Sequence, residues 1–178
     1  MRPISLPRRL MIALVVALFS AILFRGQVAT ALVTRGDEFL YRGEITQARA
    51  HYLRALLFDP HFLAAADRYI FFSLQEKTTE NLTDAIQVAD ASLRFAPRDA
   101  DLLYDRGLCL RYMHRYGLAA KDFAAAASLR RNPRLYHLAA WAALRAHDPR
   151  QARAWWRRAL AIDHSFSPAR NALAMVSH

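Results

Sequence analysis

A pattern of small and large side chains recurs four times between residues 29 and 164. Each copy begins with a small residue and has another small residue seven positions later. The residue four positions after the start is large in three of the four copies. The copies begin at Ala48, Ala85, Ala119 and Ala152, so their starts are 37, 34 and 33 residues apart. A period of this length is typical of arrays in which each unit buries its apolar face against its neighbours. The repeat therefore predicts a stack of similar units.

A second recurring position precedes each copy, at Gly36, Ile70, Gly107 and Ala140. A small residue there lets the partner helix approach closely, and the large residue of that partner fills the space between neighbours. The second unit departs from this pattern, because Ile70 is large and Ala89 is small. Its three extra residues fall in the polar stretch 76–81, where we expect a longer turn. With the prolines that end the first two units, the packing signature is Gly36, Ala48, Tyr52, Ala55, Pro60, Ala85, Pro97, Gly107, Ala119, Phe123, Ala126, Ala140, Ala152, Trp156 and Ala159.

These residues resemble the tetratricopeptide repeat (TPR) family over about residues 29–164. The resemblance implies an all-α, right-handed α-solenoid of four helical hairpins, over residues 29–62, 63–99, 100–132 and 133–164. Residues 165–178 are expected to form a capping helix and tail, because Ser167 suits an N-cap and Pro168 the first helical position. No stretch alternates with a period of two residues, so we expect no sheet.

Residues 10–24 are apolar or small and carry no charge. Arginines precede this segment and Arg25 follows it, which predicts a transmembrane signal anchor over residues 10–25 behind a basic cytoplasmic leader over residues 1–9. The repeats then lie outside the cytoplasm, on a single-pass protein of the inner or plasma membrane. Two alternatives stay open: a cleavable signal peptide, with Ala29-Thr30-Ala31 as the cleavage motif, and a buried N-terminal helix of a soluble protein.

The sequence contains no recognisable catalytic, metal or cofactor motif. Cys109 is the single cysteine and lies beside the packing residue Gly107, so we expect a buried, inert thiol. The seven histidines form no pair four residues apart on one helix, and five glycines do not supply a phosphate-binding loop. Acidic pairs at residues 37–38 and 99–101 are expected at helix starts, where they complement the helix dipole. The sequence therefore predicts a protein that is not an enzyme and needs no cofactor.

The resemblance implies that the first helix of each hairpin lines an inner groove that binds a peptide or a helix. One TPR subtype clamps carboxylates in this groove with Lys, Asn and Arg, but this chain carries Val33, Asp37, Asp101 and Asp105 at those positions, which argues against recognition of chaperone tails. Alternatively, the apolar residues at the groove positions pack inside the array or are covered by another copy of the chain. The candidate groove residues are Val33, Asp37, Leu40, Asp67, Phe71, Leu74, Asp101, Tyr104, Leu108, Arg111, Tyr112, Arg134, His137, Trp141 and Arg145.

Basic residues concentrate at the C-terminal end, where residues 111–178 carry twelve Lys or Arg and three Asp or Glu. A solvated face, an acidic partner, anionic lipid and nucleic acid all fit this excess, although export of the domain disfavours nucleic acid. The expected function is a membrane-anchored scaffold for protein–protein interaction in a cell-envelope assembly, with membrane-associated proteins as partners and no small-molecule substrate. The alternatives are a cleaved, secreted or periplasmic adaptor, and a binder of anionic polymer through the Arg-rich third.

Overall fold

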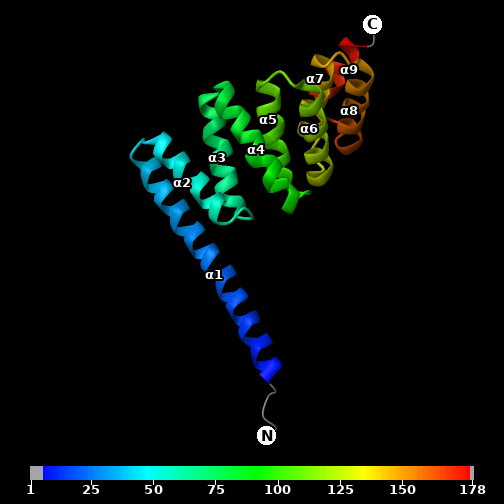
Figure 1. The fold of residues 1–178 in the computed structure, drawn as a ribbon. Helices are drawn as coiled ribbons and strands as arrows, with labels where there is room; N and C mark the ends of the chain where they lie inside the picture. Colours follow the sequence, from blue (N-terminus) through cyan, green and yellow to red (C-terminus); the bar gives the residue numbers. More distant parts are fainter. Residues whose placement is uncertain (1–5, 177–178) are drawn as a thin grey trace. The chain divides into compact units, whose positions relative to one another are not determined.

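Helices are the only regular elements among residues 6–176, which the computed structural model describes, and that range contains no strand. Residues 1–5 of the predicted leader and residues 177–178 of the predicted tail lie outside the described residues. The chain divides into two compact units, Met1–Ala65 and Ala66–His178. The helices, labelled in Figure 1, are α1 Leu6–Tyr41, α2 Ile45–Phe58, α3 Leu63–Glu76, α4 Thr79–Phe95, α5 Ala100–Tyr112, α6 Tyr116–Arg130, α7 Pro133–Arg145, α8 Pro149–Ile162 and α9 Ser167–Met175.

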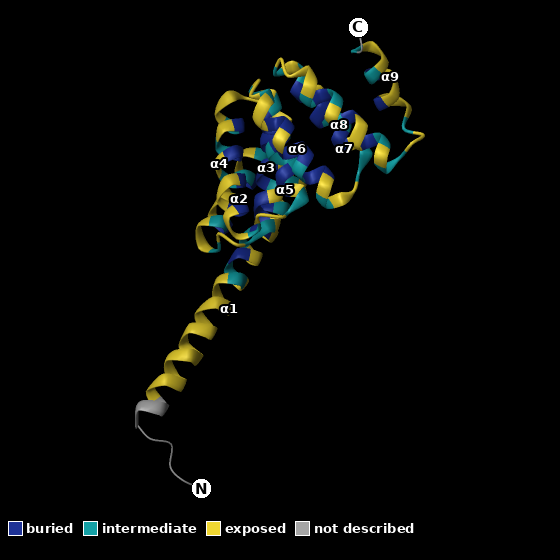
Figure 2. Cartoon of the chain, turned by 90° about the vertical axis from the view of Figure 1, so that its right-hand side faces the viewer, coloured by how far each residue is buried: buried dark blue, intermediate teal, exposed yellow. Residues whose placement is uncertain are grey.

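In the first unit, α1 is a single helix of 36 residues. The anchor and the first repeat helix, which the sequence analysis treated as separate segments, are therefore continuous. The chain between them contains no proline, and one Gly26 inside a helix costs only about 1 kcal/mol. Residues 10–25 are exposed along their whole length (Figure 2). The later part of α1 packs against α2, and its Ala29 and Val33 are buried.

In the second unit, consecutive helices pack against one another from α4 to α9 (Figure 1). Phe123 of α6 and Trp156 of α8 are fully buried, as are both unusual residues of the second repeat, Ile70 and Ala89. A Cβ atom on Gly107 would lie 2.7 Å from the Phe123 ring, which is closer than packed carbon atoms approach. Gly36 stands in the same relation to Tyr52 in the first unit, at 2.5 Å. Because Gly36 of α1 and Gly107 of α5 have no side chain, an aromatic ring of the next helix fits against each of them.

Each hairpin turns at one residue with a left-handed backbone: Gly43, Lys77, His114 and His147, with φ between 53° and 77°. Each stands seven positions after the packing residue of its first helix, and the second helix begins two positions later. The prediction of a longer turn in the second repeat is therefore wrong, because its turn has the same length as the other three. The three extra residues extend α4 instead, which has 17 residues, against 14 in α2 and 15 in α6. Thr78 explains this, because its side chain caps α4 by accepting from the Asn81 N–H.

The helix ends confirm the predicted position of Asp99 and Asp101 at a helix start, and they correct the predictions for Asp37-Glu38 and for Ser167. Asp99 is the N-cap of α5, where its carboxylate accepts from two backbone N–H groups. Asp37 and Glu38, however, lie near the C-terminal end of α1, because the merged helix begins 31 residues before Asp37. Ser167 is the first residue of α9 and Phe166 is its N-cap.

Candidate functional site

The predicted groove residues of the first unit are mostly covered. Val33 is buried, and Asp37 and Leu40 are half-buried. Asp37 accepts a hydrogen bond of 2.8 Å from the Tyr52 hydroxyl, so its carboxylate joins α1 to α2. In the second unit Leu74 is also buried. Val33 and Leu74 therefore belong to the interior and do not line an open surface.

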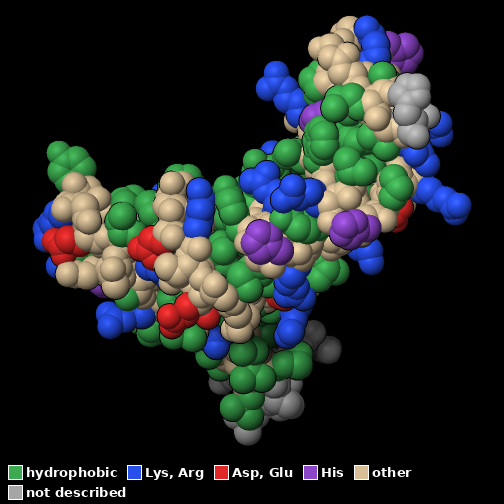
Figure 3. Space-filling view, turned by 90° about the horizontal axis from the view of Figure 1, so that it is seen from above, with side chains coloured by type: hydrophobic (Ala, Val, Ile, Leu, Met, Phe, Trp, Pro, Cys, Tyr) green, Lys and Arg blue, Asp and Glu red, His purple; other side chains and the backbone are tan. Residues whose placement is uncertain are grey.

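The other predicted groove residues of the second unit are exposed or half-buried. Asp67, Phe71, Asp101, Arg134 and Arg145 are exposed, as are Tyr112 and Trp141 at 38% and 40%. The half-buried members are Tyr104, Leu108, Arg111 and His137. Figure 3 shows Lys and Arg side chains beside hydrophobic side chains and histidines on the face that it presents.

Acidic groups gather where α3 and α5 begin. Burial, followed by the charges of Asp67 and Asp101, raises the pKa of Asp105 to about 7. Burial also raises the pKa of Asp67, with the charges of Asp99 and Asp101 adding to the effect. Asp101 forms an ion pair with Arg130 of α6. This end of the second unit is therefore unsuited to a carboxylate ligand.

A hollow of about 500 Å³ lies where the C-terminal ends of α5 and α7 meet the α5–α6 turn. Four predicted groove residues line it together: Arg111, Tyr112, Trp141 and Arg145. The sequence did not predict the other lining residues. The groove positions taken over from the TPR family exclude the hairpin turn and the start of the second helix, and on α7 they do not include Leu138 and Ala142. The missed residues are His114, Tyr116, Leu138 and Ala142.

A chain of polar contacts positions one side of the hollow. Arg145 donates to the Tyr116 hydroxyl at 3.4 Å, with its guanidinium over the Tyr116 ring. The same hydroxyl lies 2.7 Å from Nδ1 of His114, so it can donate there while it accepts from Arg145. Across the hollow, the Arg111 guanidinium lies 5.1 Å from the centre of the Tyr112 ring, and Lys77 lies 4.8 Å from it. Cations and aromatic faces thus alternate around the opening.

His137 lies between two tryptophans behind this lining. Its Nε2 is 2.9 Å from the indole nitrogen of Trp141, and its Nδ1 is 3.0 Å from that of Trp156. Burial lowers the pKa of His137, which favours the neutral ring. A neutral imidazole has one acceptor nitrogen, so it accepts from only one of the two indole N–H groups at a time. The fully buried Trp156 loses more when unpaired than Trp141, which is partly exposed.

The remaining candidates for chemistry have structural surroundings. Cys109 is buried, and burial together with the charge of Asp105 raises the pKa of its thiol to about 12. Among the residues described, no group of three or more His, Cys, Asp or Glu side chains is placed to hold a metal ion.

The hairpins, their left-handed turn residues and the small-to-large contacts between helices define a tetratricopeptide-like helical repeat. The solved structures most relevant here are those of MamA and PilF, both tetratricopeptide-repeat proteins. A crystal structure of MamA matches 79% of this chain and 81% of its own, with a TM-score of 0.66 and 15% identity. MamA from Desulfovibrio magneticus RS-1 matches 78% of this chain and 77% of its own, with a TM-score of 0.62 and 19% identity.

PilF from Pseudomonas aeruginosa matches 85% of this chain and 68% of its own, with a TM-score of 0.60 and 21% identity. At these identities the likeness concerns the fold. No protein-family model matches the chain, and no curated protein matches its sequence. The predicted all-α repeat of TPR type is confirmed by the structure and by these likenesses.

Proposed function

We propose that the protein is a membrane-anchored scaffold that binds other proteins of a cell-envelope assembly. The observation that carries this proposal is that α1 is one continuous helix with an exposed apolar first part and a packed later part. Its residues 10–25 are exposed and apolar, and the same helix continues into the segment that packs on α2. An anchor built in this way holds the first hairpin at a set distance from the bilayer.

The exposed apolar surface of α1 supports insertion into lipid. Its large hydrophobic side chains between Leu10 and Phe24 are 50–66% exposed. Full burial of such a side chain contributes about 1.5–3 kcal/mol, so a stretch of this length is costly to leave in water. Among the residues described, α1 is the one helix long and apolar enough to cross a membrane. The arginines at residues 2, 8 and 9 favour a cytoplasmic N-terminus.

The alternative of a cleaved leader meets an obstacle in the packing. A cut after Ala31 would divide α1 inside the helix and remove Ala29, which is fully buried. Cleavage would thus uncover part of the interior of the first hairpin. N-terminal sequencing of the mature chain separates the two cases: a start at Leu32 supports the soluble adaptor, and an intact N-terminus supports the anchor.

The decisive test of the anchor is alkaline extraction of membranes from cells that express the full-length chain. We expect the protein to stay in the pellet. The matched variant Val16→Arg/Phe19→Arg places two charges in the apolar segment, at about 2.5–3.5 kcal/mol each near a helix centre, and is expected to move to the supernatant. Release of the unaltered protein by alkali would refute the anchor.

The scaffold half of the proposal is tested by crosslinking in intact membranes followed by mass spectrometry. We expect recovery of membrane-associated partners. Substitution of the exposed groove aromatics Phe71 and Trp141 by Ala is expected to reduce that recovery, because aromatic side chains dominate contact energies. The control is Phe95→Ala, an exposed aromatic on α4. Recovery of no partner by the unaltered protein would contradict a scaffold role.

A second candidate function rests on the arginines of α8. Arg150, Arg157 and Arg158 are exposed, as a binder of anionic polymer requires. Filter binding of single-stranded DNA across salt concentrations tests this function, because contacts with phosphates lose affinity steeply as salt rises. If the affinity for DNA depends only weakly on salt, or if no DNA is retained on the filter, the arginines of α8 form a solvated face without a ligand.

A further inference from the structure

The hollow between the ends of α5 and α7 is cationic and lacks a counter-ion of its own. Arg111 and Arg145 line it, and its described lining contains no Asp or Glu. The acids of the second unit that face Asp105 lie at the opposite ends of α3 and α5, where those helices begin. A ligand with a negative charge can therefore pair with the two guanidinium groups without displacing a carboxylate of the lining.

The hollow also has hydrogen-bond donors that its own acceptors do not satisfy. His137 accepts from either Trp141 or Trp156, and the buried Trp156 holds that acceptor more strongly. The indole N–H of Trp141, at the exposed edge of the hollow, is then available to an acceptor outside the chain. Arg145 contributes further N–H groups, because only one of its nitrogens is used by Tyr116.

The size and the remaining lining suit a side chain of a polypeptide. A volume of about 500 Å³ lies within the usual range of ligand sites. Leu138, Ala142 and the faces of Tyr112 and Trp141 supply the apolar part of the wall. This apolar wall suits a neighbouring apolar side chain better than a polar lipid headgroup, and a nucleic-acid backbone is recognised by cations spread along many phosphates.

We propose that this hollow binds an acidic segment of a partner polypeptide. A carboxylate pairs with Arg111 and Arg145 and accepts from the Trp141 N–H, and a neighbouring apolar side chain packs on Trp141 and Leu138. Guanidinium and carboxylate groups match in geometry and form strong, charge-assisted hydrogen bonds. The site differs from the positions of the TPR carboxylate clamp, where this chain carries Val33, Asp37, Asp101 and Asp105. The proposal deepens the scaffold function and rests on it.

The test uses the full-length protein in detergent micelles and a fluorescein-labelled heptapeptide of alternating Glu and Phe with both ends blocked. We expect a rise in fluorescence anisotropy on binding, and about tenfold weaker binding in Arg111→Gln and in Arg145→Gln, because each loses a hydrogen bond to a charged group. Trp141→Phe keeps an aromatic side chain, although a smaller one, and removes the indole N–H, for a loss of about threefold. Arg94→Gln makes the same charge change at an exposed site on α4, outside the hollow, and is expected to stay within about twofold.

Four further outcomes decide the proposal. Equal binding of the Glu peptide and its Gln counterpart, or equal binding by Arg145→Gln and the unaltered protein, would overturn it. Binding of dioleoylphosphatidylglycerol vesicles or single-stranded DNA through Arg111 and Arg145, without peptide binding, would also overturn it. Binding of a Gln peptide with a free C-terminus, lost in Arg145→Gln, would support the site with a terminal carboxylate as the source. Circular dichroism checks that each variant keeps its helices.

The failure of this proposal is distinguishable from failure of the scaffold function. If Arg111→Gln/Arg145→Gln crosslinks to the same membrane partners as the unaltered protein, the scaffold stands and the acidic-segment site is wrong. If the unaltered protein crosslinks to no partner, the scaffold function fails whatever the peptides do.

Discussion

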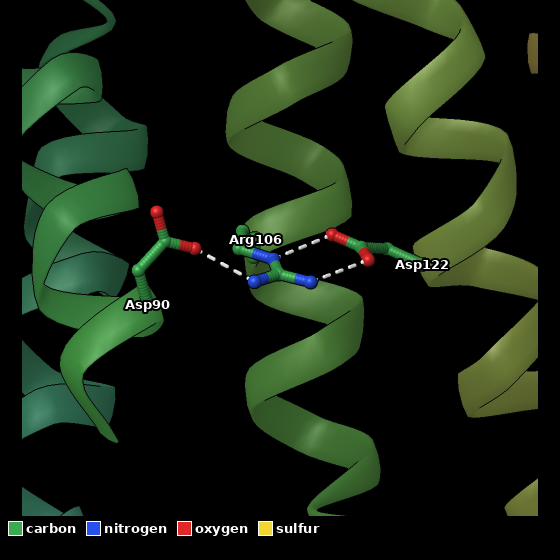
Figure 4. Close-up of polar contacts among 3 residues, drawn as sticks. All are labelled: Asp90, Arg106 and Asp122. Atoms are coloured by element: carbon green, nitrogen blue, oxygen red, sulfur yellow. Dashed lines mark hydrogen bonds and ion pairs between the residues drawn. The ribbon is translucent and has the colours of Figure 1, made fainter. Parts of the chain in front are cut away.

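The guanidinium of Arg106 in α5 forms two parallel hydrogen bonds of 2.7 Å with the carboxylate of Asp122 in α6 (Figure 4). Its third nitrogen donates to Asp90 of α4, also at 2.7 Å. Asp122 is buried, and these hydrogen bonds raise the pKa of Arg106. One side chain thus joins three successive helices from two hairpins, and in a repeat array such contacts between neighbours carry much of the stability.

Asp122→Asn should lower the free energy of unfolding by about 2–3 kcal/mol, because it leaves a partly buried guanidinium without its paired charge. The control is Asp90→Asn, which removes the exposed partner and should cost at most about 1 kcal/mol. Urea unfolding followed by circular dichroism measures both values. Equal losses in the two variants would contradict the unequal roles assigned to the two carboxylates.

Gly107→Ala should destabilise the protein by about 1–3 kcal/mol, because the added methyl group meets the ring of Phe123 in a filled interior. The same substitution at Gly117 meets nothing closer than 3.9 Å, so Gly117→Ala should be neutral or slightly stabilising. Thermal unfolding of the two variants checks the difference. If Gly107→Ala is as stable as Gly117→Ala, the close contact with Phe123 is not what requires a glycine.

Cys109 should resist alkylation in the folded protein. Its buried thiol has a pKa of about 12, so almost no thiolate exists near pH 8, and iodoacetamide reacts with the thiolate. We expect labelling to be at least about a hundredfold slower than in concentrated urea, where the pKa returns to about 8.5. Mass spectrometry of the labelled chain gives both rates. Fast labelling under native conditions would contradict the buried, inert thiol.

In acid, two groups act in opposite senses. Asp105, whose pKa is raised to about 7, takes up its proton first in the folded chain and so stabilises the fold as the pH falls. Protonation of His137 should weaken the fold. Burial lowers its pKa in the folded state below the unfolded value of 6.5, so the unfolded chain takes up the proton first. The stability that neutral His137 contributes is therefore complete above pH 6.5 and is lost as the pH falls through the folded pKa. Protonation also removes the acceptor for the Trp156 N–H. Unfolding free energies between about pH 7.5 and about pH 5, from roughly one unit above the unfolded histidine pKa to roughly 1.5 units below it, measure the sum of the two effects.

His137→Gln should remove the destabilising part of this dependence and leave that of Asp105, because the glutamine does not titrate. The variant should therefore become more stable relative to the unaltered protein as the pH falls. His61→Gln, at an exposed turn position, serves as the control and should keep the slope of the unaltered protein. The same pH dependence in His137→Gln and in the unaltered protein would contradict the role assigned to His137.

Local pattern predicted the fold well because TPR packing repeats locally. The spacing of Gly36, Gly107 and Ala140 predicted where one helix makes room for the next, and the contacts of Tyr52 and Phe123 with the two glycines agree with it. The sequence pattern gave a wrong prediction for the second repeat, where two local structures are compatible with the same residues. Three extra residues can lengthen a turn or a helix, and the cap made by Thr78 favours the helix.

The amino-acid sequence alone determined the helical repeat, its phase and the apolar N-terminal segment, because these depend on residue size and polarity at fixed spacing. Only the tertiary structure decided which side chains share a site. Arg111, Tyr116, Trp141 and Arg145 come from three helices and meet in one hollow, while Val33 and Leu74, expected beside them, are buried. The physical reason is that the packing of helices against one another decides which side chains are buried and which come into contact. The spacing of residues along a single helix does not specify that packing.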